Sequence, residues 1–316
     1  MRGRRVLIIA GILALLLSAP ALLWFWACHR DPLAALPPPE HGLQADRQAL
    51  PAPDGRTVSR LTLHGKSLGD IVFTLSLPEP LPQAKLPLVL VLAGLATAEN
   101  SLRYIQDPGD NAVAAYAWPV PSRLAGAAAA LRQGPQIYRR VLAVPGQAVS
   151  ILHWLRAQPW ADGGRVSLLG YSLGALAAPA VLDVAGHDGI HVGWTIIAYG
   201  GAPLGAVLAA NPSLKPPWLR RALAPLLDLA LHPLEPTLHL PRVSGKFLVL
   251  QGQDDGLIPG AARDRLKAAV PDPKTIITFE GTHMGVGPQK MALLQEIIAA
   301  SKRWLMENGA VNPVPF

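Results

Sequence analysis

One short motif constrains the fold of this chain more than any other feature. Residues 170–174 read Gly-Tyr-Ser-Leu-Gly and directly follow the apolar run 166–169. The residues after them, 175–182, are mostly good helix formers, so the sequence predicts a strand, a sharp turn and a helix in that order. A G-x-S-x-G turn of this kind holds its serine in a strained, exposed conformation. We therefore interpret Ser172 as a candidate nucleophile.

Two later segments supply the partners that an activated serine needs. Such a serine requires a histidine within hydrogen-bonding reach and a carboxylate that orients this histidine. The apolar run 246–250 leads into a loop with Asp254 and Asp255, and the β-branched run 275–279 leads into a loop with His283. All the candidates follow predicted strands, and open parallel sheets have their binding crevice at the carboxyl ends of the strands. We therefore expect the serine, one carboxylate and the histidine to meet there.

These segments resemble the α/β-hydrolase family of serine hydrolases, in particular its dienelactone-hydrolase-like and prolyl-oligopeptidase-like catalytic domains. The resemblance covers roughly residues 58–305. It rests on the turn around Ser172, the G-x-x-D-x-x-x-P loop at 252–259 and the G-x-H turn at 281–283. By this alignment Asp255 is the acid. Asp254 stays open as an alternative, because a one-residue difference in loop conformation would exchange the carboxylate that points inward.

The resemblance implies an α/β-hydrolase fold with a mostly parallel, eight-stranded sheet flanked by helices. The order of apolar segments along the chain predicts the same class, because strands that alternate with helices form parallel sheets covered on both faces. The eight strand candidates are 58–63, 71–77, 86–92, 113–118, 166–169, 194–198, 246–250 and 275–279.

An acyl-transfer site also needs backbone donors for the oxyanion of the tetrahedral intermediate. One donor is expected at the amide of Leu173, directly after the serine. The other is expected in the loop after the strand 86–92, where Ala93 stands in place of the histidine that such families often carry. Because the donor is a backbone amide, this replacement does not remove it, and we assign it to Leu95.

The first thirty residues are expected to lie outside the catalytic fold. Three arginines precede an uncharged, mostly apolar run at 6–27, which is long enough to cross a bilayer that needs about 20 residues. This pattern predicts a single-pass anchor in a bacterial inner membrane, with the remainder of the chain on the periplasmic or outer side. A cleaved signal peptide is the alternative, since Ala19-Pro20-Ala21 has the small residues that a signal peptidase reads.

The remaining composition defines the expected domains and excludes some partners. The stretch 31–54 is rich in proline and alanine and predicts a semi-extended linker, followed by one catalytic domain at 55–310. The net charge of +7 includes the arginines of the membrane flank, and no basic run suggests a nucleic-acid partner. His232 and His239 fit no zinc spacing, and no metal or organic cofactor is expected. The one cysteine, Cys28, excludes an intrachain disulfide.

Together these features predict a serine hydrolase, with a carboxylesterase of class EC 3.1.1 as the first hypothesis. A serine peptidase or an acyltransferase could use the same residues. A hypothesis of another class is a noncatalytic, membrane-tethered binding protein that has kept the fold. The expected substrate is a small-molecule or lipid-like acyl ester, the latter because of the predicted membrane location. The sequence does not define the oligomeric state.

Overall fold

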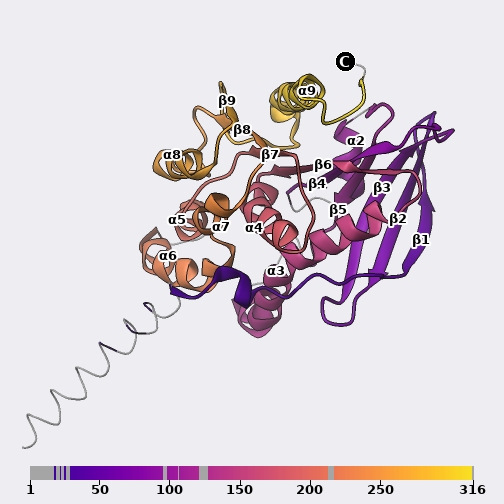
Figure 1. Ribbon diagram of the computed structural model, residues 1–316. Coiled ribbons are helices and arrows are strands. Elements are labelled where there is room, and N and C mark those ends of the chain that lie inside the picture. The colour runs from indigo at the N-terminus through magenta and orange to yellow at the C-terminus, as the bar shows by residue number, and fades with distance from the viewer. Residues whose placement is uncertain are drawn as a thin grey trace, which may run out of the picture.

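The computed structural model describes residues 29–94, 98–105, 107–120, 127–212 and 217–314, together with Ser18, Leu22 and Phe25. In this part of the chain nine strands form one sheet, in the order β1-β2-β3-β5-β4-β6-β7-β8-β9 (Figure 1). The strands are β1 (Ala45–Leu50), β2 (Arg56–His64), β3 (Asp70–Pro78), β4 (Leu86–Leu92), β5 (Ala112–Tyr116), β6 (Ala161–Tyr171), β7 (Trp194–Ala198), β8 (Lys246–Gly252) and β9 (Lys274–Phe279). The helices are α2 (Ala98–Ile105), α3 (Ala127–Arg156), α4 (Leu173–His187), α5 (Leu204–Ala210), α6 (Pro217–Leu231), α7 (Pro236–His239), α8 (Gly260–Ala269) and α9 (Met291–Glu307).

The sheet is mostly parallel, as predicted. Every pair from β5 through β9 is parallel, whereas β1, β2 and β3 join one edge through antiparallel pairs. All eight strands expected from the sequence are present. The number eight is wrong for the described residues, however, because β1 adds a ninth strand at the edge of the sheet.

Helices cover both faces of the sheet (Figure 1). The central strand β4 is buried along its whole length, and its side chains alternate between two cores. Leu88 and Leu90 pack in the core shared with α3 and α4, while Val89 and Val91 pack in the core shared with α2 and α9. A strand that is buried on both faces reads as one continuous apolar run, which explains why the sequence identified it.

The sequence predicts a linker at 31–54, and the structure contradicts this prediction. Residues 45–50 form β1, which pairs with the residues of β2 from Val58 to Leu63. Before β1, the side chain of Leu36 is buried in the main core. The carboxylate of Glu40 accepts hydrogen bonds from the amides of Lys66, Ser67 and Leu68. The segment is therefore packed on the domain, because a proline-rich sequence can bury apolar side chains without forming a helix.

The predicted domain limits of 55 and 310 are too narrow for the same reason. At the carboxyl end, Ala310 and Val314 are buried. The Asn312 amide donates to the side-chain oxygen of Asn111, beside β5, at 2.8 Å. The packed unit therefore includes residues before 55 and after 310.

Glu40 provides a test of this packing through its pKa. Partial burial raises the pKa of Glu40, but the hydrogen bonds from Leu68, Lys66 and Ser67 outweigh burial and hold the pKa at about 2, below the ordinary 4.5. A carboxyl group whose pKa is lowered by folding stabilises the fold above its ordinary pKa, and this stabilisation is lost as the pH falls toward the folded-state pKa. The Glu40 contribution should therefore be complete above pH 4.5 and disappear toward pH 2.

Replacing Glu40 with glutamine should lower the midpoint of thermal unfolding at pH 7 by roughly 2–4 °C, since a charged acceptor of three amide hydrogen bonds is lost from a partly exposed site. The difference between the wild type and the variant should shrink as the pH falls from 4.5 toward 2. Thermal unfolding followed by circular dichroism at a series of pH values measures both effects. Glu307→Gln, at the exposed end of α9, is the matched control. Equal midpoints for the two variants at pH 7 would contradict the packing role of Glu40.

The apolar run at 6–27 lies almost entirely outside the described residues. Among the residues that are described, no helix is both long enough and apolar enough to cross a membrane. The membrane anchor therefore stays a prediction from the sequence.

Candidate active site

Ser172 lies in the sharp turn between β6 and α4, as the motif predicts. Its backbone has a φ of 53°, a conformation that few non-glycine residues adopt. The two motif glycines allow this turn. A Cβ atom on Gly170 would lie 2.7 Å from the carbonyl oxygen of Gly174, and one on Gly174 would lie 1.8 Å from the carbonyl oxygen of Leu92. Neither position has room for a side chain, so both glycines are required for α4 to pack this closely on the sheet.

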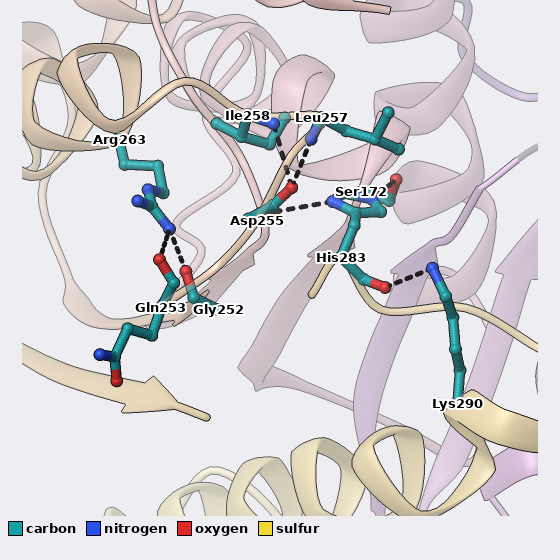
Figure 2. A network of polar contacts seen from close by, with 9 residues as sticks. All are labelled: Ser172, Gly252, Gln253, Asp255, Leu257, Ile258, Arg263, His283 and Lys290. Carbon is teal, nitrogen blue, oxygen red and sulfur yellow. Dashed lines mark hydrogen bonds and ion pairs between the residues drawn. The ribbon is translucent and has the colours of Figure 1, made fainter. Parts of the chain in front are cut away.

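His283 lies beside the serine, on the loop after β9. The Ser172 hydroxyl donates a hydrogen bond to His283 Nε2, with an oxygen to nitrogen distance of 2.8 Å. The imidazole is buried, and the ring of Tyr199 meets it edge to face with 5.4 Å between ring centroids. Lys290 Nζ donates to the His283 carbonyl oxygen at 2.8 Å (Figure 2). The histidine is thus held both through its ring and through its backbone.

Asp255, on the loop after β8, completes a hydrogen-bonded chain. His283 Nδ1 donates to Asp255 Oδ2 at 2.8 Å. The other carboxylate oxygen accepts from the amides of Leu257 at 2.9 Å and Ile258 at 3.0 Å (Figure 2). Burial raises the pKa of Asp255, but the hydrogen bond and charge of His283, with the two amides, outweigh burial and hold the pKa below its ordinary value. The carboxylate is therefore ionised at neutral pH.

The neighbouring Asp254 is placed differently. Its side chain is exposed, and its amide donates to the carbonyl oxygen of Gly281 at 3.0 Å. Arg263 donates to the carbonyl oxygens of Gly252 and Gln253 and so braces the same loop (Figure 2). Of the two carboxylates that the sequence left open, Asp255 is the one that reaches His283.

This geometry suits proton transfer to and from a reacting hydroxyl. A serine whose proton points at a neutral imidazole nitrogen can lose that proton as its oxygen attacks a carbonyl carbon. The buried, ionised carboxylate fixes the Nδ1–H tautomer and stabilises the imidazolium that results. All three side chains come from the carboxyl ends of parallel strands, and two of them are buried, so the hydrogen bonds are largely shielded from water.

One of the two expected oxyanion donors, the amide of Leu173, belongs to the described residues. Leu173 is the first residue of α4, and amides in the first turn of a helix have no acceptor within the helix. The partial positive charge of the helix N-terminus adds to this site. Leu95, the second expected donor, lies outside the described residues. The loop that leads to it is anchored, since Trp118 Nε1 donates to the carbonyl oxygen of Ala93 at 2.8 Å.

A mostly apolar cavity of about 310 Å³ opens beside Ser172, between α2, α9 and the sheet. Its walls include Tyr171 and, from the loop of the expected oxyanion donor, Ala93 and Gly94. The apolar lining residues are Val89, Val91, Ile105, Val113, Leu169, Met284, Val286, Leu294, Ile298, Leu305, Val311 and Val314. The cavity is therefore suited to an uncharged, apolar group next to the serine.

Three further residues contact the site, although no sequence motif identifies them: Tyr199, Trp118 and Lys290. Tyr199 follows β7 with a φ of 59°, and burial, then the charges of Asp255 and Glu296, raise its pKa to about 12. Trp118 and Lys290 act through the backbone, on Ala93 and His283. Their position along the chain could have identified two of them, because Tyr199 and Trp118 lie just beyond the carboxyl ends of β7 and β5.

No group at this site forms a metal-binding cluster among the described residues. The set of histidine and carboxylate atoms close enough to share an ion lies elsewhere, at His41, His153 and Asp188.

Comparisons with known proteins place this arrangement in a fold. No family model and no curated protein sequence matches the chain. Among solved structures, it is similar to an acetyl xylan esterase from Paenibacillus sp. R4, with 14% identity, a TM-score of 0.58 and coverage of 88% of this chain and 93% of that one. It is also similar to an S-formylglutathione hydrolase from Agrobacterium tumefaciens, with 16% identity, a TM-score of 0.55 and coverage of 82% and 98%.

A third similar structure, a puromycin hydrolase, has 15% identity and a TM-score of 0.54, and the match covers 88% of this chain but 50% of that one. At such low identity these likenesses establish the fold, and the activities of the other proteins do not follow from it. The chain has the α/β-hydrolase fold, as the sequence resemblance implied.

Proposed function

We propose that the protein is a serine hydrolase that cleaves carboxylic esters through an acyl-enzyme on Ser172. The observation that carries this proposal is the continuous hydrogen-bonded chain from the Ser172 hydroxyl through His283 to the buried carboxylate of Asp255. Its position at the carboxyl end of the sheet, next to a helix N-terminus and an apolar cavity, gives further support. The names of two similar solved structures, an acetyl xylan esterase and an S-formylglutathione hydrolase, support this assignment.

The proposed reaction has two halves. In the first, Ser172 Oγ attacks the ester carbonyl carbon while His283 Nε2 accepts the hydroxyl proton, and the amides of Leu173 and Leu95 donate to the oxyanion. The carbon to alkoxide bond then breaks, and His283 returns the proton to the departing alcohol. In the second half, His283 takes a proton from water as the water oxygen attacks the acyl carbon. The bond from this carbon to Ser172 Oγ then breaks, His283 returns the proton to Oγ, and the acid leaves. Asp255 holds the His283 ring in place throughout.

For the substrate, we propose an ester with a short or medium acyl chain that fits the cavity beside Ser172. The volume of about 310 Å³ is at the lower end of the usual range of ligand pockets, roughly 300–1,000 Å³. At about 30 Å³ for each water-sized group, it has room for on the order of ten such groups. The apolar walls favour a hydrocarbon chain, because burial of each methylene contributes roughly 0.8 kcal/mol.

Filling the cavity should change the preferred chain length. Replacing Ile298, on the α9 wall, with tryptophan should lower kcat/KM for an octanoyl ester by roughly 10- to 100-fold relative to an acetyl ester, since several methylene groups lose their place. Hydrolysis of 4-nitrophenyl esters of increasing chain length measures this ratio. Leu226→Trp, on the exposed face of α6, is the matched control. An unchanged ratio in Ile298→Trp would show that the acyl chain binds elsewhere.

We also propose that residues 6–27 anchor the chain in a bacterial inner membrane, with the hydrolase on the periplasmic or outer side. The support is the apolar run, the preceding arginines and the aromatic residues 24–26. Cells that express the full chain should retain it in the membrane pellet after washing at alkaline pH. Release of a shortened chain into the soluble fraction would instead favour cleavage of a signal peptide.

A further inference from the structure

We propose that His41, His153 and Asp188 bind a divalent transition-metal ion, zinc in particular, which fastens the segment before β1 to the helices α3 and α4. The three residues come from separate parts of the chain: the amino-terminal segment, the last turn of α3 and the C-cap of α4. Two imidazoles and one carboxylate are a ligand set that zinc accepts, with a water molecule as the fourth ligand.

The three potential ligand atoms lie close enough together to share one ion after small side-chain movements. His41 Nε2 lies 3.3 Å from Asp188 Oδ2, and His153 Nε2 is in close hydrogen-bonding contact with the same oxygen. One potential ligand atom from each of the three residues lies within 4.8 Å of the others. Zinc bonds of about 2.0–2.2 Å at tetrahedral angles separate two ligand atoms by roughly 3.3–3.6 Å. Small side-chain rotations would therefore allow one ligand atom from each of the three residues to coordinate the same ion.

The surroundings also favour a cation. His153 lies in the last turn of α3 and Asp188 caps α4, so the carboxyl ends of two helices meet at the cluster. Each helix end carries partial negative charge, which stabilises a nearby positive ion. The Asp188 amide donates to the carbonyl oxygen of Val184 at 3.0 Å, which fixes the backbone of this ligand in advance.

The exposure of the three side chains suits a bound ion with one open position. The side chains of His153 and Asp188 are 21% and 24% exposed, whereas that of His41 is 56% exposed. The two inner ligands are therefore partly shielded from water, and the fourth position faces solvent. In the metal-free protein, Nε2–H groups point at the carboxylate. Zinc would take the place of these protons, because it binds the Nε2 lone pair and requires that atom to be unprotonated.

The site is remote from the candidate active site. Ser172 precedes the first residue of α4, and Asp188 follows its last. The fifteen helical residues lie between them, and a rise of 1.5 Å per residue places Ser172 and Asp188 about 24 Å apart along the helix. His41 is next to Glu40, which already binds the loop at 66–68. The ion would thus hold the segment at 36–44 to the domain and take no part in ester hydrolysis.

Titration of zinc into the detergent-solubilised full chain, after treatment with a chelator, tests the proposal by calorimetry. We expect about one zinc ion to bind to the wild type, and the affinity to fall at least about tenfold in His153→Ala and in Asp188→Asn. Asp188→Asn keeps the size of the ligand, so a loss of binding in it does not depend on a change of shape. His64→Ala, which removes a histidine between Asp46 and Asp70, is the control and should bind as the wild type does.

Hydrogen exchange measures whether zinc holds the segment at 36–44 to the domain. Zinc should slow the exchange of amides at 36–44 in the wild type and leave them unchanged in His153→Ala, while ester hydrolysis stays the same in both. Equal zinc affinity in the wild type and both ligand variants, or a loss of binding in His64→Ala alone, would overturn the proposal. So would zinc binding that leaves exchange at 36–44 unchanged.

Discussion

Replacing Ser172 with alanine should lower kcat for ester hydrolysis by roughly 10⁵- to 10⁶-fold, because the variant has no oxygen that can form the acyl-enzyme. The residual rate would come from the oxyanion donors and from binding of the substrate, which remain. The fold should persist, since alanine is smaller than serine and the Ser172 amide can still donate to the carbonyl oxygen of Ala198. Steady-state kinetics on a 4-nitrophenyl ester measures the loss, and thermal unfolding shows that the variant is folded.

A matched control for this variant is Ser244→Ala, which removes an exposed hydroxyl between α7 and β8. It should hydrolyse the ester within about twofold of the wild type. A folded Ser172→Ala protein that retains activity would contradict the proposed nucleophile. The noncatalytic binding protein would then become the leading hypothesis.

Replacing Asp255 with asparagine should lower kcat by roughly 10⁴-fold, whereas Asp254→Asn should change it by less than about threefold. The Asp255 carboxylate accepts from His283 Nδ1 and so leaves Nε2 free to take the serine proton. An amide group at this position can donate to Nδ1 instead, which favours the wrong tautomer and leaves the imidazolium without a counter-charge. Asp254 is exposed and makes no such contact, which makes it a control for charge in the same loop.

The same two variants should also differ in how the stability of the fold depends on pH. The pKa of Asp255 is held below its ordinary value, so its ionised form stabilises the fold above about pH 3.8 and this contribution is lost at lower pH. The free energy of unfolding of Asp255→Asn should lack this dependence on pH, and that of Asp254→Asn should retain it. Denaturant unfolding at a series of pH values measures both. A larger loss of kcat in Asp254→Asn than in Asp255→Asn would show that the loop carries the other carboxylate inward during catalysis.

Sequence patterns predicted most of the sheet because its central strands are buried on both faces. The runs 86–92 and 246–250 are continuous and apolar, and the structure places β4 and β8 there. The edge strand β1 could not be found in this way. Its residues, ADRQAL, are largely exposed and show no alternation, so that its strand conformation depends on hydrogen bonds to β2. Such pairing is a property of the tertiary fold and leaves little trace in local composition.

The same distinction applies to the candidate site. The turn around Ser172 and the loop positions of His283 could be read from the sequence, because the motif and the strand ends impose them. The choice between Asp254 and Asp255 depended on a loop conformation that the amides of Leu257 and Ile258 fix. No sequence motif marks Tyr199, because its contact with the His283 ring depends on the turn after β7.

Labelling with a fluorophosphonate probe, followed by mass spectrometry of the peptides, tests the central claim most directly. The probe reacts with an activated serine and requires no knowledge of the substrate. We expect the full chain in detergent to be labelled at Ser172, and the labelling to be lost in His283→Ala, whose serine has no base. No labelling of the folded wild type, or labelling of another serine that persists in Ser172→Ala, would contradict the account of this site as a serine hydrolase.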